Sequence, residues 1–115
     1  MSETIIELGA TPVILDVDDS YNMDPKLLEQ AITPNTKLIV PVHMLGNPCE
    51  MDKINEIAKR HGIPVLEDGC EAFGGFYKGK PVGALGDISV FSFDFAKTIT
   101  TGEGGCIFTN DRFLD

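Results

Sequence analysis

The amino-acid sequence predicts a single α/β domain in which a mainly parallel sheet is flanked by helices. Continuous apolar runs rich in β-branched residues, such as residues 37–43 and 63–67, have the length and composition of strands buried on both faces. Segments with apolar residues at three- and four-residue spacing, such as residues 51–61, separate these runs. Strands that alternate with helices favour a parallel sheet whose ligands bind outside the carboxyl ends of its strands.

The N-terminal part is expected to hold a short helix and then a strand. Residues 2–8 present a small apolar helical face that stops at Gly9, and glycine commonly ends helices. Residues 11–17 form a continuous apolar run with β-branched side chains. This run predicts a strand buried on both faces.

The next two elements are a helix and a strand. Asp24 and Pro25 suit the N-cap and the first position of a helix that continues to residue 32. Residues 37–43 follow as a strand with Pro41 close to its end, where a missing backbone donor is tolerated.

The second half of the chain begins with the most regular helical pattern in the sequence. Residues 51–61 repeat apolar side chains along one face, and Gly62 is placed to cap the C-terminus. Residues 63–67 then predict a short buried strand. A glycine-rich connection leads to further strands at residues 87–93 and 105–109, and a loop that contains Lys97 joins these two.

Composition excludes several classes of function. Eighteen acidic and nine basic residues give a formal charge of −9, which repels phosphate backbones and anionic membranes. No apolar run approaches the roughly 20 residues that span a bilayer, and the first residues lack the pattern of a secretory signal. We therefore expect a cytoplasmic protein without nucleic-acid or membrane partners. Cys49, Cys70 and Cys106 are odd in number and widely spaced, which indicates neither a disulfide framework nor a metal site.

Three polar residues at strand ends suggest a cofactor chemistry. A deprotonated lysine reacts covalently with carbonyl compounds, and pyridoxal 5'-phosphate (PLP) is the usual carbonyl cofactor. PLP requires a lysine for its aldehyde, a carboxylate for its pyridine nitrogen and hydroxyl or backbone donors for its phosphate. Lys97, Asp68 and Ser92 supply one of each. Taken alone, a lysine such as Lys97 between two strands is usually a solvated surface charge, and Asp68 is as consistent with a turn residue as with a cofactor ligand.

Short motifs occur in a fixed order along nearly the whole chain. They are Val42-His43 with Gly46 and Pro48, Met51-Asp52, His61-Gly62, Glu67-Asp68-Gly69-Cys70-Glu71-Ala72, Gly79, Gly83, Gly86-Asp87, Phe91-Ser92-Phe93 with Lys97, Thr101 to Gly105, and Thr109-Asn110-Asp111. The most specific is S-x-x-x-x-K-x-x-x-x-G-E-G-G, which starts at Ser92.

This order resembles the DegT/DnrJ/EryC1/StrS family of PLP-dependent aminotransferases, which act on nucleotide-linked keto sugars. The resemblance implies part of the large domain of a fold-type I PLP-dependent transferase. It implies that Lys97 bonds to the cofactor and then transfers a proton, that Asp68 pairs with the pyridine nitrogen and that Ser92 binds the phosphate. Glu71 stands where the family usually has Gln, near the cofactor ring and its phenolic oxygen.

The resemblance also implies substrates and an assembly. An amino acid such as glutamate donates the amine, a nucleotide-linked keto sugar receives it, and the site is shared across a homodimer. Lys97 favours transamination, because relatives with His at this position are dehydratases. Residues 1–115 are expected to be a partial domain, the central portion of the PLP-binding large domain without its N-terminal strands and the C-terminal domain, and to be inactive alone. The sequence leaves the roles of His43 and Glu103 open: His43 is a weaker site candidate that is more often a packing residue at a strand end, and Glu103 with its glycines is more consistent with shaping the turn.

A phosphoacceptor receiver domain is the alternative from another class. Asp18, Asp19 and Asp68 after strands supply the carboxylates with which such a module holds Mg²⁺. The position of Lys97 argues against this alternative, because a receiver lysine directly closes a strand and is usually followed by proline, whereas Lys97 lies within a loop and precedes Thr98.

Overall fold

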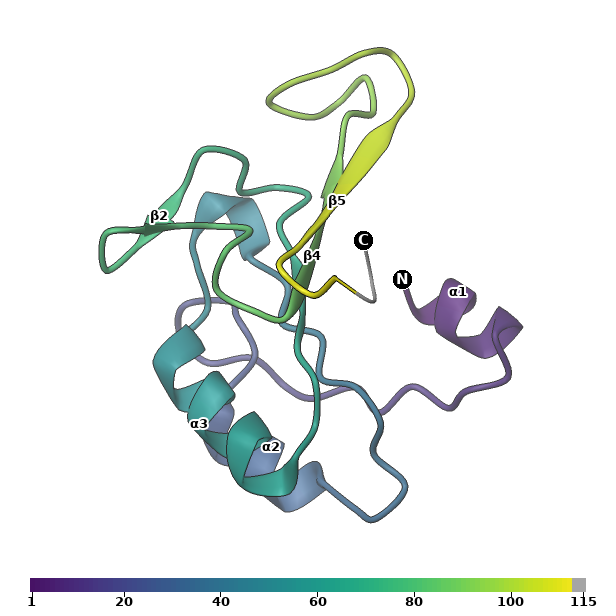
Figure 1. The fold of residues 1–115 in the computed structure, drawn as a ribbon, viewed down its shortest axis with the longest axis vertical. Coiled ribbons are helices and arrows are strands. Elements are labelled where there is room, and N and C mark those ends of the chain that lie inside the picture. Colours follow the sequence, from purple (N-terminus) through teal and green to yellow (C-terminus); the bar gives the residue numbers. More distant parts are fainter. Residues whose placement is uncertain (113–115) are drawn as a thin grey trace.

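A mixed sheet and two packed helices form the centre of the structure, a computed structural model that describes residues 1–112 (Figure 1). The elements are α1 (Ser2–Glu7), α2 (Pro25–Ala31), the 3-10 turn η1 (Met44–Gly46), α3 (Met51–His61), β1 (Leu66–Asp68), β2 (Phe76–Tyr77), β3 (Lys80–Pro81), β4 (Ile88–Ser92) and β5 (Gly105–Thr109). Strands β1, β4 and β5 form the main sheet in that order, and β2 and β3 form a separate hairpin.

The sheet is mainly parallel, as the sequence predicts. β1 pairs with β4 in parallel, and residues 37–43 run parallel to β1 through bridges at Ile39–Val65 and Val42–Asp68. Pro41 lies between these bridges, and its missing N–H interrupts the ladder. β5 is antiparallel to β4, because a loop without a helix returns the chain directly alongside β4.

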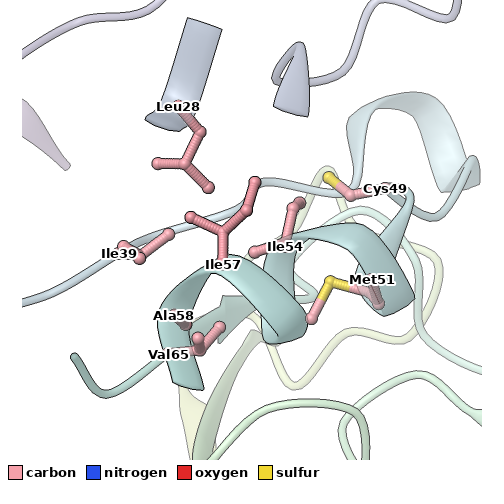
Figure 2. Packing of buried hydrophobic residues seen from close by; sticks show 8 residues of the cluster. All are labelled: Leu28, Ile39, Cys49, Met51, Ile54, Ile57, Ala58 and Val65. Carbon is pink, nitrogen blue, oxygen red and sulfur yellow. The ribbon is translucent and has the colours of Figure 1, made fainter. Parts of the chain in front are cut away.

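The two predicted central helices are confirmed, and they pack against each other to build the main core (Figure 2). The side chain of Asp24 caps α2 by accepting the N–H of Lys26, and Gly62 ends α3 in the left-handed conformation with φ 64°. Both signals are local in sequence, and both act as predicted. The buried core residues are Leu28, Ile39, Cys49, Met51, Ile54, Ile57, Ala58 and Val65.

The predicted buried strand at residues 11–17 is wrong. The segment is extended but forms only one bridge, Val17 with Met23, and Val13 and Ile14 are 68% and 79% exposed. Within residues 1–112 no strand pairs along it, and only Leu15 of its large apolar side chains packs against the main core. The preceding helix, α1, forms as expected but buries no residue and lies apart from α2 and α3 (Figure 1).

The glycine-rich connection folds over one face of the sheet. Phe91 of β4 packs there with Ala72 and Val82 in a second apolar cluster. A Cβ atom at Gly69 or Gly83 would come within 2.6 or 2.8 Å of the Phe91 ring, so only glycine permits this approach. No helix in the described part of the chain is long and apolar enough to cross a membrane.

Candidate active site

Asp68 is fixed at the carboxyl end of β1. Its backbone N–H donates to the Pro41 carbonyl at 2.9 Å, and its carbonyl accepts the backbone N–H of His43 at 3.0 Å. Its carboxylate accepts the backbone N–H of Cys70 at 3.0 Å, and the residue is 9% exposed. The strand end and the turn after it therefore hold this carboxylate in one place.

Ser92 lies on the same face of the sheet as Asp68. Asp68 is opposite Val90 in the parallel ladder, and Ser92 follows Val90 by two residues, so all three side chains point to one face. The Ser92 hydroxyl oxygen accepts the backbone N–H of Asp94 at 3.3 Å. The hydroxyl hydrogen can still donate, because an accepted hydrogen bond does not use it.

Lys97 stands in a loop, between β4 and β5, that is built from successive tight turns. Its backbone N–H donates to the Asp94 carbonyl at 3.0 Å, and the Asp94 carboxylate accepts the N–H of Ala96 at 3.1 Å. Farther along, the backbone N–H of Thr101 donates to the Phe93 carbonyl at 3.0 Å. Lys97 is half-buried, and these turns place it just beyond the strand end that carries Ser92.

The pKa of the Cys70 thiol is affected by both Asp68 and Lys97. Burial raises the pKa of the Cys70 thiol to about 11, a hydrogen bond and the negative charge of Asp68 add to the rise, and the Lys97 ammonium opposes it. Asp68 and Lys97 thus act on one thiol with opposite signs. The sequence motif contains Cys70 between Asp68 and Glu71, but its spacing alone does not indicate this role.

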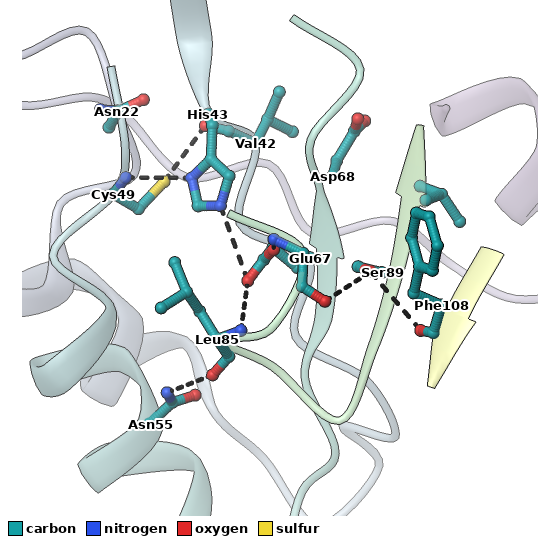
Figure 3. A network of polar contacts seen from close by, with 12 residues as sticks. Asn22, Val42, His43, Cys49, Asn55, Glu67, Asp68, Leu85, Ser89 and Phe108 are labelled. Carbon is teal, nitrogen blue, oxygen red and sulfur yellow. Dashed lines mark hydrogen bonds and ion pairs between the residues drawn. The ribbon is translucent and has the colours of Figure 1, made fainter. Parts of the chain in front are cut away.

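A buried polar network lies behind Asp68 on the opposite face of β1 (Figure 3). The side chains of His43 and Glu67 are fully buried, and the carboxylate of Glu67 accepts the backbone N–H groups of Gly83 and Leu85, the second at 3.0 Å. His43 Nδ1 accepts the N–H of Cys49 at 3.0 Å, so the neutral ring carries its hydrogen on Nε2.

His43 Nε2 is the buried atom that this network leaves incompletely satisfied. It lies 3.9 Å from Glu67 Oε2, which is too long for a hydrogen bond, and it has no hydrogen-bond partner among the described residues. The Nε2–H nevertheless faces an acceptor. His43 thus has one ring nitrogen bonded and the other directed at Glu67.

A model of the DegT/DnrJ/EryC1/StrS aminotransferase family matches residues 1–115. The chain belongs to the DegT/DnrJ/EryC1/StrS aminotransferase family. Members of this family are PLP-dependent aminotransferases with the fold-type I architecture, and the membership leaves the receiver alternative without support.

Curated relatives and solved structures align with nearly all of this member of the DegT/DnrJ/EryC1/StrS family. GDP-perosamine synthase of Caulobacter vibrioides is 51% identical over 114 residues, which cover 98% of this chain and 31% of the relative. The aminotransferase structure from Psychrobacter cryohalolentis has a TM-score of 0.94 at 43% identity and covers 97% of this chain and 29% of that one. The PLP form of the putative sugar aminotransferase Spr1654 from Streptococcus pneumoniae has a TM-score of 0.89 at 35% identity, covering 98% and 33%. This chain thus spans about a third of the length of its relatives.

Three of the four predicted site residues suit the cofactor of the DegT/DnrJ/EryC1/StrS family. Asp68 offers a fixed carboxylate, Ser92 an available O–H donor and Lys97 a half-buried amine; Asp68 and Ser92 end neighbouring strands, and Lys97 lies in the loop after the second. This donor set has the chemistry that PLP requires.

Glu71 is placed differently from these three. Its carboxylate is exposed and accepts the backbone N–H of Leu45 at 3.0 Å. Leu45 has a positive φ of 52°, a conformation that costs free energy in a residue with a side chain, so Glu71 stabilises the turn that follows residues 37–43. In this structure Glu71 is an anchor for that turn, and its expected place beside the cofactor ring stays a prediction.

Proposed function

We propose that this chain carries the lysine-bearing part of a PLP site in an aminotransferase that acts on nucleotide-linked keto sugars. The observation that carries the proposal is that Asp68 and Ser92 lie on one face of the sheet at the carboxyl ends of the neighbouring strands β1 and β4, with the half-buried Lys97 in the loop that follows β4. Names of relatives support the substrate class, since GDP-perosamine synthase is named for a nucleotide-linked amino sugar.

Each residue has one task in this proposal. Ser92 donates its hydroxyl hydrogen to the phosphate, and Asp68 pairs with the protonated pyridine nitrogen. PLP, when bound, supplies an electron sink that lowers the barrier to removing a proton from the adjacent carbon. Lys97 would hold the cofactor through its deprotonated amine, and once an incoming substrate amine has released it, its Nζ would hold and move the proton.

The substrates and the assembly extend the proposal. An amino acid such as glutamate gives its amine in one half-reaction, and a nucleotide-linked keto sugar receives it in the other. The 115 residues correspond to the central portion of the PLP-binding large domain, and the complete site forms in a homodimer. The isolated chain binds the cofactor through Lys97 but does not turn over substrates, because it supplies only one part of the pocket.

A spectroscopic titration tests this function. PLP is added to the purified 115-residue chain, and we expect a visible absorbance band that is lost in Lys97→Ala. Lys59→Ala is the matched control, because Lys59 is an exposed lysine on the outer surface of α3. A band of equal intensity in Lys97→Ala, or the absence of any band in the parent chain, would contradict the proposal.

A further inference from the structure

Asp94 connects the two residues that are proposed to hold opposite ends of the cofactor. Its backbone N–H donates to the Ser92 hydroxyl oxygen at 3.3 Å, and its carbonyl accepts the backbone N–H of Lys97 at 3.0 Å. Its carboxylate accepts the N–H of Ala96 at 3.1 Å and so closes the turn that leads to Lys97. No other residue in the described part of the chain bonds to both Ser92 and Lys97 in this way.

We propose that Asp94 is a positioning residue whose carboxylate orders the lysine turn while its negative charge weakens phosphate binding at Ser92. Asp94 therefore sets how strongly this site prefers a phosphorylated ligand over the same ligand without phosphate. The inference rests on the proposed function, because it takes Ser92 as the phosphate ligand.

The charge of Asp94 is not neutralised by a close cation. None of the ion pairs within residues 1–112 includes its carboxylate. The residue is only half-buried, and the chain as a whole carries a formal charge of −9. A phosphate monoester carries about −1.5 to −2 charges at neutral pH. The two groups repel each other, and the repulsion acts over about 10 Å at 0.1 M salt.

The two effects of Asp94 are separable by substitution. Asp94→Asn keeps a side-chain oxygen that accepts the Ala96 N–H but removes the charge. Asp94→Ala removes both the acceptor and the charge. The asparagine variant therefore isolates the charge, and the comparison between asparagine and alanine isolates the ordering of the turn.

The experiment measures dissociation constants of PLP and of pyridoxal, which lacks the phosphate, by absorbance titration of the 115-residue chain and its variants. For Asp94→Asn we expect the affinity for PLP to rise about three- to tenfold more than the affinity for pyridoxal, because the removed charge acts on the Lys97 amine with both ligands but on the phosphate with PLP alone. The gain for PLP should shrink at high salt. Asp94→Ala should bind both ligands more weakly than Asp94→Asn, because the turn before Lys97 is less ordered.

Asp19→Asn is the matched control, since Asp19 is exposed and, like Asp94, takes part in none of the ion pairs within residues 1–112. Equal PLP affinity in parent and Asp94→Asn, an equal shift for PLP and pyridoxal, or the same gain in Asp19→Asn would each overturn the proposal. Any of these results would mean that Asp94 acts only as a turn residue or only through the overall charge of the chain.

A second measurement separates this inference from the proposed function. Inorganic phosphate is titrated while NMR follows the backbone amide signals of residues 92–97. Tighter phosphate binding in Asp94→Asn supports the inference even if the chain shows no Lys97-dependent absorbance band, a result that would refute the proposed function alone. Equal affinity in the two chains, or no phosphate binding in either, overturns the inference whatever the absorbance shows.

Discussion

Glu67 provides the sharpest test of the network that supports β1. Two backbone N–H donors, from Gly83 and Leu85, bond to its carboxylate, and the Nε2–H of His43 faces it from 3.9 Å. A carboxylate has only acceptors, which suits three converging donors. Glu67→Gln keeps the shape but turns an NH₂ group toward one of them. Because Glu67 is fully buried, water cannot satisfy the donor that loses its partner.

The expected cost follows from these contacts. A buried donor left without an acceptor costs about 1–3 kcal/mol, and a hydrogen bond to a charged group contributes about 1.5–3 kcal/mol. We therefore expect Glu67→Gln to lower the free energy of unfolding by about 2–3 kcal/mol. Urea unfolding followed by circular dichroism measures this value, with the slope of the free energy against urea compared between variants.

Glu71→Gln is the control for this measurement. Glu71 also accepts one backbone N–H, from Leu45, but it is exposed, so water replaces a lost bond. The expected loss in this control is below about 1 kcal/mol. A loss in Glu67→Gln within about 0.5 kcal/mol of the parent, or no larger than that in Glu71→Gln, would refute the acceptor role of Glu67.

Two further predictions concern Phe91 and Cys70. Gly83→Ala should lower the free energy of unfolding by about 1–3 kcal/mol, measured with urea, because φ is 98° and the new Cβ would lie 2.8 Å from the Phe91 ring; unchanged stability would contradict this packing. The pH dependence of Cys70 alkylation, followed by peptide mass spectrometry, should give a pKa near 11, and Lys97→Ala should raise this pKa further because the ammonium lowers it. An unchanged Cys70 pKa in Lys97→Ala would contradict an electrostatic effect of Lys97 on Cys70. Folding raises the pKa of Cys70 from 9.0 to about 11. The contribution of this thiol to the free energy of unfolding is therefore fully present below pH 9 and is lost as the pH rises toward and through 11.

The sequence predicted the helices and strands that are marked by residues close together along the chain. The helix α3 follows from its apolar periodicity and from Gly62, and α2 follows from the cap at Asp24. These features depend on residues within one or two turns of each other, so no knowledge of distant contacts is required. The strands β1, β4 and β5 also occur within a few residues of the predicted runs, because apolar composition and turn residues mark them.

The strand predicted at residues 11–17 is absent, which shows that apolar composition alone does not determine where a strand forms. Val13 and Ile14 have the residue types of a buried strand, yet both are exposed, because strand formation also needs a neighbour to pair with. The network around Glu67 was missed for a related reason. His43 and Leu85 lie far from Glu67 in sequence, and no spacing rule brings a histidine and a backbone N–H to the same carboxylate.

The candidate site was predicted in part. Asp68, Ser92 and Lys97 were predicted because each lies at or just beyond a recognisable strand end and matches a specific motif. Asp94 was missed because an aspartate two residues after a strand is an ordinary turn residue. Its bonds to Ser92 and Lys97 are visible only in the folded loop.

Reductive trapping tests whether Lys97 bonds covalently to PLP. The chain is incubated with PLP, reduced with borohydride, digested and mapped by mass spectrometry. We expect a pyridoxyl group on Lys97 at far higher occupancy than on the exposed lysines, of which Lys59 and Lys80 are internal references. Labelling of Lys97 no greater than that of Lys59 and Lys80 would contradict the account.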